Sequence, residues 1–304
     1  MKAFDAESRE VAEEQEYTEE LKSLYMTAKG SWSRVTSDQF EQIRSVASER
    51  WAPFFEQIKL PWLCWSVDEQ WCLVQQRMVR DLGWTPVVGF DPRAGVPRLI
   101  EGAVLIDFNA GLDLPSMSMM FPLELVYLYA DRLAFWHSDL MVRAPLLKDL
   151  SDAFKMLSDG QTMAVDLRNP WYKRMLGAYP GRYWELIGCT TRGASRSQFD
   201  CGCGWWRKPV RHPNCPEGQE LIEREKYFYD HGAGILIWEQ RCGGKVLPIA
   251  AKPVEEGHCS RIGNKRYKPQ SPNDHRRDLR KDLAFNYDLE DVCRKLDIER
   301  YLQD

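Results

Sequence analysis

Between residues 60 and 170, short apolar runs alternate with amphipathic stretches along the chain. The apolar runs have the length and composition of buried strands, and they lie at 63–67, 86–90, 103–108, 133–142 and 163–167. Helical patterns lie between them at 68–82, 121–130 and 145–157. Strands that alternate with helices are typical of a mostly parallel sheet covered by helices, so the pattern predicts an α/β fold.

Residues that start and stop helices stand where this pattern requires them. Asp68 precedes the first of these helices as an N-cap, and Gly83 follows its end. Pro145 opens a later helix, and Gly160 closes it. We therefore expect a Rossmann-like sheet with a helix after most of its strands.

Two amphipathic stretches precede the first predicted strand. Residues 5–28 combine a thin apolar stripe with an acidic face. Residues 36–54 have a firmer apolar face, and Thr36 and Gln39 at their start have capping-box spacing. We expect residues 1–57 to form a helical extension that packs on another part of the molecule and carries no chemistry.

From residue 171 to 218 the periodicity disappears, and Gly, Cys, Arg and Trp become frequent. We expect an irregular Cys-rich insertion here, with a zinc-binding part at 189–216. A regular pattern of apolar residues resumes with a predicted helix at 234–242 and a predicted strand at 245–249. The chain then divides into the extension (1–57), an α/β domain (58–260), and a basic segment with a last helix (261–304).

Composition narrows the classes of protein to which the chain can belong. Its 304 residues are 44% hydrophobic and 28% charged, which is ordinary for a globular protein. A net charge of −4 argues against a surface built for nucleic acid. No apolar run approaches the roughly 20 residues of a membrane-spanning helix, and the chain opens with an acidic run rather than a leader. Nine cysteines, an odd number, fit a reducing compartment, so we expect a cytoplasmic protein.

The run at 133–142 contains a polar step, His137-Ser138-Asp139, between apolar residues. Charge in a buried strand needs a compensating partner, and a metal ion is a common one. One interpretation is that Asp139 only caps the following loop. We favour a cation site at the carboxyl end of a parallel strand, where open α/β sheets bind their ligands.

A second set of metal-ligand residues lies in the insertion. Cys201, Cys203, His212 and Cys215 fall within fifteen residues and follow the pattern C-x-C, eight residues, H-x2-C. Four such ligands suit a closed, structural tetrahedral zinc site. Cys189 is an alternative ligand, and the competing interpretation is a set of unrelated thiols on a surface loop.

Two further residues are candidates because of their position. Asp230 precedes the helix at 234–242, where it either serves chemistry or caps the helix. His258 follows the strand at 245–249 and a short loop. A lone histidine is more often structural than a ligand, so His258 is a candidate metal ligand only in combination with other ligand residues.

Taken in order, these pieces resemble the GT-A fold glycosyltransferases, which use nucleotide-diphosphate sugars. The resemblance covers roughly residues 85–260 and rests on order and spacing. In that family a strand ends in a short acidic motif, usually Asp-x-Asp, whose carboxylate holds a divalent cation against the donor pyrophosphate. His137-Ser138-Asp139 matches it here, with histidine at the first acidic position. Asp230 matches an acidic residue before a later helix, and His258 matches a histidine that often completes the metal site.

The resemblance implies an activity and a set of roles. Mn²⁺ or Mg²⁺ bound by His137, Asp139 and His258 would stabilise the pyrophosphate leaving group. Asp230 would be the general base for the acceptor hydroxyl in an inverting enzyme, and would only position substrate in a retaining one. Three basic residues could reach the phosphates or could form a solvated tail; they are Arg261, Lys265 and Arg266. The acceptor is unknown.

An alternative from another class is a zinc-stabilised binding or scaffold protein without enzymatic activity. Basic residues surround the Cys/His cluster, at Arg196, Arg207, Lys208 and Arg211. Together with the neighbouring aromatic residues, these basic residues could bind an acidic partner, including nucleic acid. A zinc deaminase is excluded, because His212 is followed by Pro213 and Asn214 rather than by the H-x-E of that class.

Overall fold

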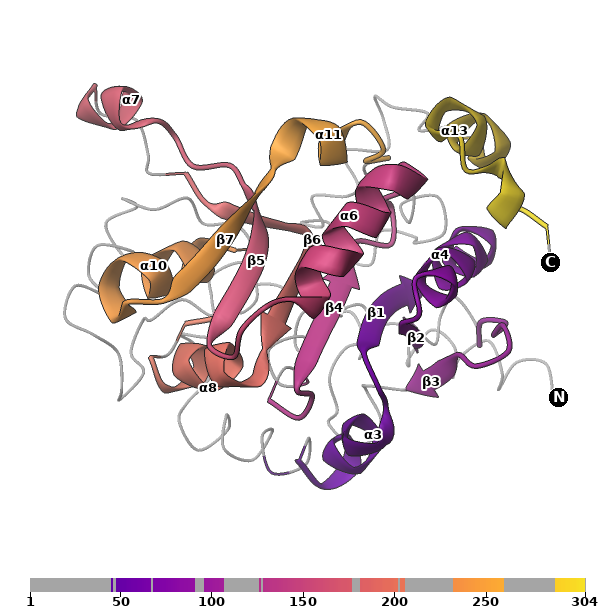
Figure 1. The fold of residues 1–304 in the computed structure, drawn as a ribbon, viewed down its shortest axis with the longest axis horizontal. Coiled ribbons are helices and arrows are strands. Elements are labelled where there is room, and N and C mark those ends of the chain that lie inside the picture. The colour runs from indigo at the N-terminus through magenta and orange to yellow at the C-terminus, as the bar shows by residue number, and fades with distance from the viewer. Residues whose placement is uncertain are drawn as a thin grey trace, which may run out of the picture.

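The protein is described here from a computed structural model. The structure describes residues 45, 48–66, 68–90, 96–106, 126, 128–176, 181–201, 203–205, 232–259 and 288–303. Seven strands of this part of the chain form one sheet, in the order β3-β2-β1-β4-β6-β5-β7 (Figure 1). The strands are β1 (Pro61–Ser66), β2 (Thr85–Phe90), β3 (Val104–Ile106), β4 (Arg132–Trp136), β5 (Gln161–Asp166), β6 (Tyr183–Thr191) and β7 (Lys245–Ala250).

Helices cover both faces of the sheet (Figure 1). They are α3 (Ala52–Gln57), α4 (Glu69–Asp81), α6 (Ala144–Lys155), α7 (Trp171–Met175), α8 (Arg192–Asp200), α10 (Ala233–Cys242), α11 (Ala251–Glu255), α13 (Leu289–Leu296) and the 3-10 turn η4 (Glu299–Tyr301). The predicted α/β class with a mostly parallel sheet is confirmed. None of the helices among the described residues is long and apolar enough to cross a membrane.

The strand directions explain why three functional candidates, His137, Asp139 and His258, lie at one edge of the sheet. All strands run parallel except β6, which is antiparallel to both of its neighbours, β4 and β5. The carboxyl ends of the parallel strands therefore share an edge, and the amino end of β6 lies at that same edge. Ligands of open α/β sheets bind at such an edge.

Alternate residues of the central strands enter two separate cores. On β1, Leu63 and Trp65 enter the first core, which also contains residues of α3, α8 and α10. Trp62 and Cys64 enter the second core, which contains residues of α4, α6, α11 and α13. Both cores are rich in aromatic side chains; Trp62, for example, packs against Trp136 with ring centroids 5.4 Å apart. A strand buried on both faces reads as a continuous apolar run, as the sequence of β1 does.

The predicted helix signals act as expected around α4. The Asp68 carboxylate accepts hydrogen bonds from the backbone N–H groups of Gln70 and Trp71. Gly83, at φ +76°, lies just beyond the helix in a left-handed conformation that glycine adopts without strain.

Strand β4 is shorter than predicted. The sequence indicated a strand over 133–142, but β4 ends at Trp136. The Leu140 N–H donates to the His137 carbonyl at 3.2 Å, so the polar residues form a turn that leaves the sheet. A turn lets Asp139 face the edge of the sheet instead of a neighbouring strand.

The prediction of an irregular stretch over 171–218 is wrong in two places. Residues 171–175 form α7. Residues 183–200 form β6, in the interior of the sheet, and then α8. Residues of β6 are buried on both faces, so the strand shows no alternation, and its run contains Glu185 and Gly188. Helix α8 (RGASRSQFD) has few apolar residues, so its periodicity is faint.

Both ends of the described chain pack against the sheet domain. Trp51 and Phe55 of the predicted extension are buried in the first core. At the other end, the last predicted helix forms as α13 and stops at Leu296, because Asp297 adopts φ +59°. The predicted helix at 5–28, most of those at 36–54 and 121–130, and the basic segment up to residue 287 lie outside the described residues.

Candidate metal centre

The turn after β4 is held in place by a buried amide from α4. Gln75 Nε2 donates hydrogen bonds to the carbonyl oxygens of His137 and Leu140, both at 2.8 Å. Gln75 is fully buried, so these bonds form away from water. The His137 N–H also donates to the Leu186 carbonyl of β6 at 2.8 Å. The backbone that carries His137 and Asp139 is therefore fixed from two sides.

A loop from far along the chain pairs with this turn. Beyond β7 and α11, the Cys259 N–H donates to the Asp139 carbonyl at 2.8 Å, and the Met141 N–H donates to the Gly257 carbonyl at 3.0 Å. Leu140 and His258 form an antiparallel bridge between these contacts. A Cβ on Gly257 would lie 1.8 Å from the Met141 carbonyl oxygen, so only glycine permits this approach.

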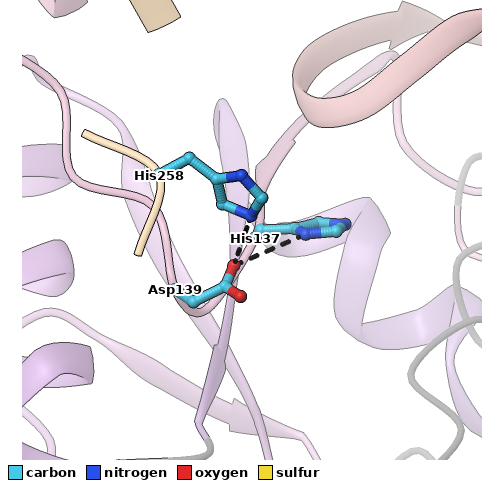
Figure 2. A group of neighbouring side chains, drawn as sticks. All are labelled: His137, Asp139 and His258. Atoms are coloured by element: carbon cyan, nitrogen blue, oxygen red, sulfur yellow. Dashed lines mark ion pairs between the residues drawn. The ribbon is translucent and has the colours of Figure 1, made fainter. Parts of the chain in front are cut away.

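These two backbone segments bring His137, Asp139 and His258 together (Figure 2). One carboxylate oxygen of Asp139, Oδ1, lies 3.5 Å from His137 Nδ1 and 3.5 Å from His258 Nε2. Two ligands about 2.1 Å from one ion lie about 3.0 to 3.4 Å apart at octahedral or tetrahedral angles. The three side chains are 15 to 17% exposed, so an ion among them would still be reachable from solvent. The geometry and the donor atoms fit a divalent cation.

A buried carboxylate orients His137 from its other side. Glu185 Oε1 lies 3.5 Å from His137 Nε2, and Glu185 Oε2 accepts a hydrogen bond from Arg182 Nη1 at 3.0 Å. The Glu185 side chain is only 3% exposed. A carboxylate on the second nitrogen of a histidine fixes the ring and makes the first nitrogen a better ligand. His137 Nδ1 is thereby directed at the site that Asp139 and His258 share.

The same neighbours set the charges of the cluster. Burial lowers the pKa of His137, but its hydrogen bonds with Asp139 and Glu185 outweigh burial and raise that pKa to about 10. Burial raises the pKa of Asp139, but hydrogen bonds with His137 and His258 outweigh it and hold that pKa well below its usual range. Without a metal ion, a proton on His137 provides the positive charge. A metal ion would have to displace this proton.

An aromatic ring from β6 contacts the cluster. Trp184 packs edge-on against the His258 ring, with centroids 5.1 Å apart and an interplanar angle of 82°. The ring limits the orientations of His258. Trp205, another tryptophan of the Cys-rich stretch, is instead buried against Phe135 in the first core.

The predicted site residues fall into three groups: some meet, some lie elsewhere in the fold, and some lie outside the described residues. His137, Asp139 and His258 meet as a group. Cys201 and Cys203 follow α8 and contact the first core, whereas Cys189 is buried in the second core on the opposite face of the sheet. Cys189 as an alternative zinc ligand is therefore wrong. Six candidates lie outside the described residues: His212, Cys215, Asp230, Arg261, Lys265 and Arg266.

Sequence reasoning missed two residues that support the site. Glu185 stands within the apolar run of β6, which is the same signal of a charge in a buried strand that singled out Asp139. Gln75 lies in the middle of α4 and looks like any polar helix residue, so no pattern marks it.

No protein-family model matches the chain, and no curated protein matches it. The function therefore has to be inferred from the chemistry and placement of the site.

Proposed function

We propose that the chain is a metal-assisted glycosyltransferase of the GT-A type, which transfers a sugar from a nucleotide-diphosphate donor to an acceptor hydroxyl. One observation carries the proposal. Asp139 and His258 are distant in sequence, yet Asp139 Oδ1 and His258 Nε2 lie 3.5 Å apart at the edge where the parallel strands end. The resemblance to GT-A enzymes implies this meeting, because it assigns both residues to one cation.

The three ligands define the kind of ion and its role. Two imidazole nitrogens and one carboxylate oxygen favour Mn²⁺ over Mg²⁺, because Mg²⁺ prefers oxygen ligands alone. The ion, when bound, supplies positive charge that stabilises the diphosphate leaving group. Asp139 would hold the ion through Oδ1, His137 through Nδ1 and His258 through Nε2, and Glu185 would keep His137 in the required orientation.

A polar pocket of about 340 Å³ beyond the carboxyl end of β5 offers room for an acceptor. Because β5 is parallel to β1, β2 and β7, its carboxyl end lies at the edge that holds the metal centre. Charged groups and an exposed indole suit a hydroxyl-rich ligand. The lining residues are Asp166, Arg168, Asn169, Pro170, Trp171, Arg174 and Gln240.

Other roles rest on the resemblance alone. Asp230 is the proposed general base for an inverting transfer, and Arg261, Lys265 and Arg266 are proposed contacts to the donor phosphates. Their roles would be tested by kinetics once a donor is known.

The proposal is tested by melting the full chain with a panel of nucleoside diphosphates and their sugars, with and without Mn²⁺. A ligand that binds only the folded state adds about 2.7 kcal/mol of stability at a hundred times its dissociation constant. We expect a shift that needs both Mn²⁺ and one nucleotide, and that disappears in Asp139→Asn. Asp152→Asn is the matched control, because Asp152 is an exposed residue of α6 whose carboxylate pairs with Lys148.

Absence of a shift with every nucleotide would contradict the proposal. The zinc-stabilised binding protein would then be the better account, and salt-sensitive retention on an acidic polymer would support it.

A further inference from the structure

Large apolar side chains are exposed together on α7 and on the residue that follows it. Nine large apolar side chains are exposed in the described part of the chain, and four of them lie within residues 171–176. They are Trp171 (66% exposed), Tyr172 (51%), Met175 (77%) and Leu176 (85%). Single exposed apolar side chains are normal on a protein surface, but a contiguous group indicates an interaction site.

The four apolar side chains share one side of the helix, which we call the α7 face. Residues four apart lie above one another, which pairs Trp171 with Met175 and Tyr172 with Leu176. At about 100° per residue, all four fall within an arc of about 140°. Two exposed basic residues occupy the opposite side of the helix; they are Lys173 and Arg174.

The two basic side chains carry charge that the protein does not neutralise locally. Residues 171–176 contain no acidic residue. Within the described residues, neither Lys173 nor Arg174 pairs with a carboxylate from elsewhere in the fold. The segment therefore combines an exposed apolar face with two positive charges that are available to a partner.

The fold holds α7 away from the body of the molecule. Figure 1 shows α7 at the outer end of β5 and β6, apart from every other labelled helix. At the base of this arm, the Arg168 guanidinium pairs with Asp166 of β5 at 2.8 Å and with Glu239 of α10 at 3.1 Å. A Cβ on Gly181 would lie 2.4 Å from the Leu167 carbonyl oxygen, so the two sides of the arm pack closely there. The base is thus fixed, while no residue of α7 is buried.

We infer that the α7 face inserts into the surface of an anionic lipid bilayer, while Lys173 and Arg174 contact the lipid headgroups. Trp and Tyr are enriched at the boundary between acyl chains and headgroups, because their rings are apolar with a polar tip. A helix with an apolar face and a basic opposite side lies in that boundary. Lys and Arg near the surface are attracted by the negative charge of anionic lipids.

The same features favour a lipid surface over a protein partner. Lysine is depleted in the cores of protein–protein interfaces, whereas it is typical of helices that lie on membranes. A single helical turn buries little apolar surface, so insertion is shallow and reversible and depends on the two cations. Binding should therefore weaken as salt is added. This docking does not depend on the proposed glycosyltransferase activity.

The test is cosedimentation of the full chain with lipid vesicles. We expect binding to vesicles of phosphatidylcholine mixed with phosphatidylserine, little binding to phosphatidylcholine alone, and release by salt. Met175→Asp places a charge in the α7 face and should weaken binding at least about 10-fold. Met156→Asp is the matched control, because Met156 is an equally exposed methionine at the end of α6 and should leave binding unchanged.

A second variant separates charge from apolar contact. Lys173→Gln combined with Arg174→Gln should weaken binding to the mixed vesicles about 10- to 30-fold, because each cation near an anionic surface contributes about 1 kcal/mol. The residual binding should no longer respond to salt.

Three results would overturn the inference. The first is a folded wild-type protein that does not sediment with the mixed vesicles at low salt. The second is binding of Met175→Asp as tight as that of Met156→Asp. The third is self-association in solution that Met175→Asp abolishes while vesicle binding persists, which would assign the α7 face to a second copy of the chain.

Discussion

At the scale of single residues, the metal centre is a row of alternating charges. Arg182, Glu185, His137 and Asp139 follow one another with separations of 3.0 to 3.5 Å, and His258 closes the row beyond Asp139. Each buried charge has an opposite neighbour, which offsets the cost of removing it from water. His137 lies in the middle, where a proton and a metal ion compete for its Nδ1 atom. The affinity for Mn²⁺ should therefore rise with pH.

The protonation of His137 makes a prediction about the metal-free protein. Its pKa is raised from 6.5 to about 10 on folding, so its contribution to stability is fully present below about pH 6.5. Between these values the folded state holds one proton more than the unfolded state. Stability should then fall as pH rises, with a slope of up to about 1.4 kcal/mol per pH unit from this group.

Urea unfolding in a chelator at pH 6.5 and at pH 9 measures this effect. His137→Asn should be less stable at the lower pH and should show a smaller decline between the two. An equally steep decline in His137→Asn would assign the pH dependence to other groups.

Glu185 makes a second prediction at this scale. Glu185→Gln keeps the size of the side chain but removes the carboxylate that orients His137. Loss of such an outer partner typically lowers metal affinity about 10- to 100-fold. Calorimetric titration with Mn²⁺ should show this reduction. Unchanged affinity in Glu185→Gln would mean that the Glu185 carboxylate does not prepare His137 to bind the ion.

At the scale of elements, the site depends on a loop that docks against a turn. His258 reaches Asp139 because residues 257–259 pair with residues 139–141 through backbone hydrogen bonds. Gly257→Ala would place a methyl group 1.8 Å from the Met141 carbonyl oxygen, and backbone cannot yield as a flexible side chain can. We expect the loop to shift and the affinity for Mn²⁺ to fall at least 10-fold, with a loss of stability of about 1 to 3 kcal/mol.

Gly83→Ala is the matched control for this variant. Gly83 has φ +76°, and a Cβ there meets nothing within 4 Å. The substitution should cost about 1 kcal/mol through backbone strain and leave the affinity for Mn²⁺ unchanged. Equal effects of the two substitutions on metal affinity would show that docking of the 257–259 loop is not what positions His258.

Elements with a clear period could be predicted from the sequence, and elements without one could not. The helix at 68–82 was found with its N-cap Asp68, because its apolar face and its end signals agree. Strand β6 was missed, because burial on both faces removes the alternation and a central Gly188 weakens the apolar run. Gly188 is needed there, since a Cβ would lie 2.6 Å from the Met163 carbonyl oxygen.

At the scale of the whole molecule, one sheet separates two cores, and the C-terminal segment belongs to the second. Cys293, Leu296, Ile298 and Tyr301 are buried there. Arg77 of α4 donates a hydrogen bond to the Tyr301 carbonyl at 2.8 Å. The segment therefore stabilises the helix that carries Gln75, and through it the turn of the metal centre.

Leu296→Ala tests whether this segment contributes to the stability of the sheet domain. Leu296 is 1% exposed, and truncating a buried leucine costs about 2 to 5 kcal/mol. Leu302→Ala, in a partly buried leucine of the same segment, should cost less. Chemical denaturation of both variants gives the comparison. A loss below about 1 kcal/mol in Leu296→Ala would indicate that the segment folds apart from the sheet.

Residues distant in sequence could be assigned to one site only where the order of the strands predicts which strand ends lie close together. Asp139 follows a parallel strand and His258 lies beyond another, and carboxyl ends of parallel strands share an edge, so their order along the chain was informative. Glu185 reaches the same edge only because β6 runs antiparallel, which its sequence does not reveal.

The central claim is that His137, Asp139 and His258 bind one divalent cation, and the most direct measurement is a Mn²⁺ titration followed by electron paramagnetic resonance of the free ion. We predict that the wild-type protein and Asp152→Asn bind Mn²⁺ alike, while Asp139→Asn and His258→Ala lose at least a hundredfold in affinity. Wild-type affinity in Asp139→Asn, in a protein that is still folded, would contradict the account.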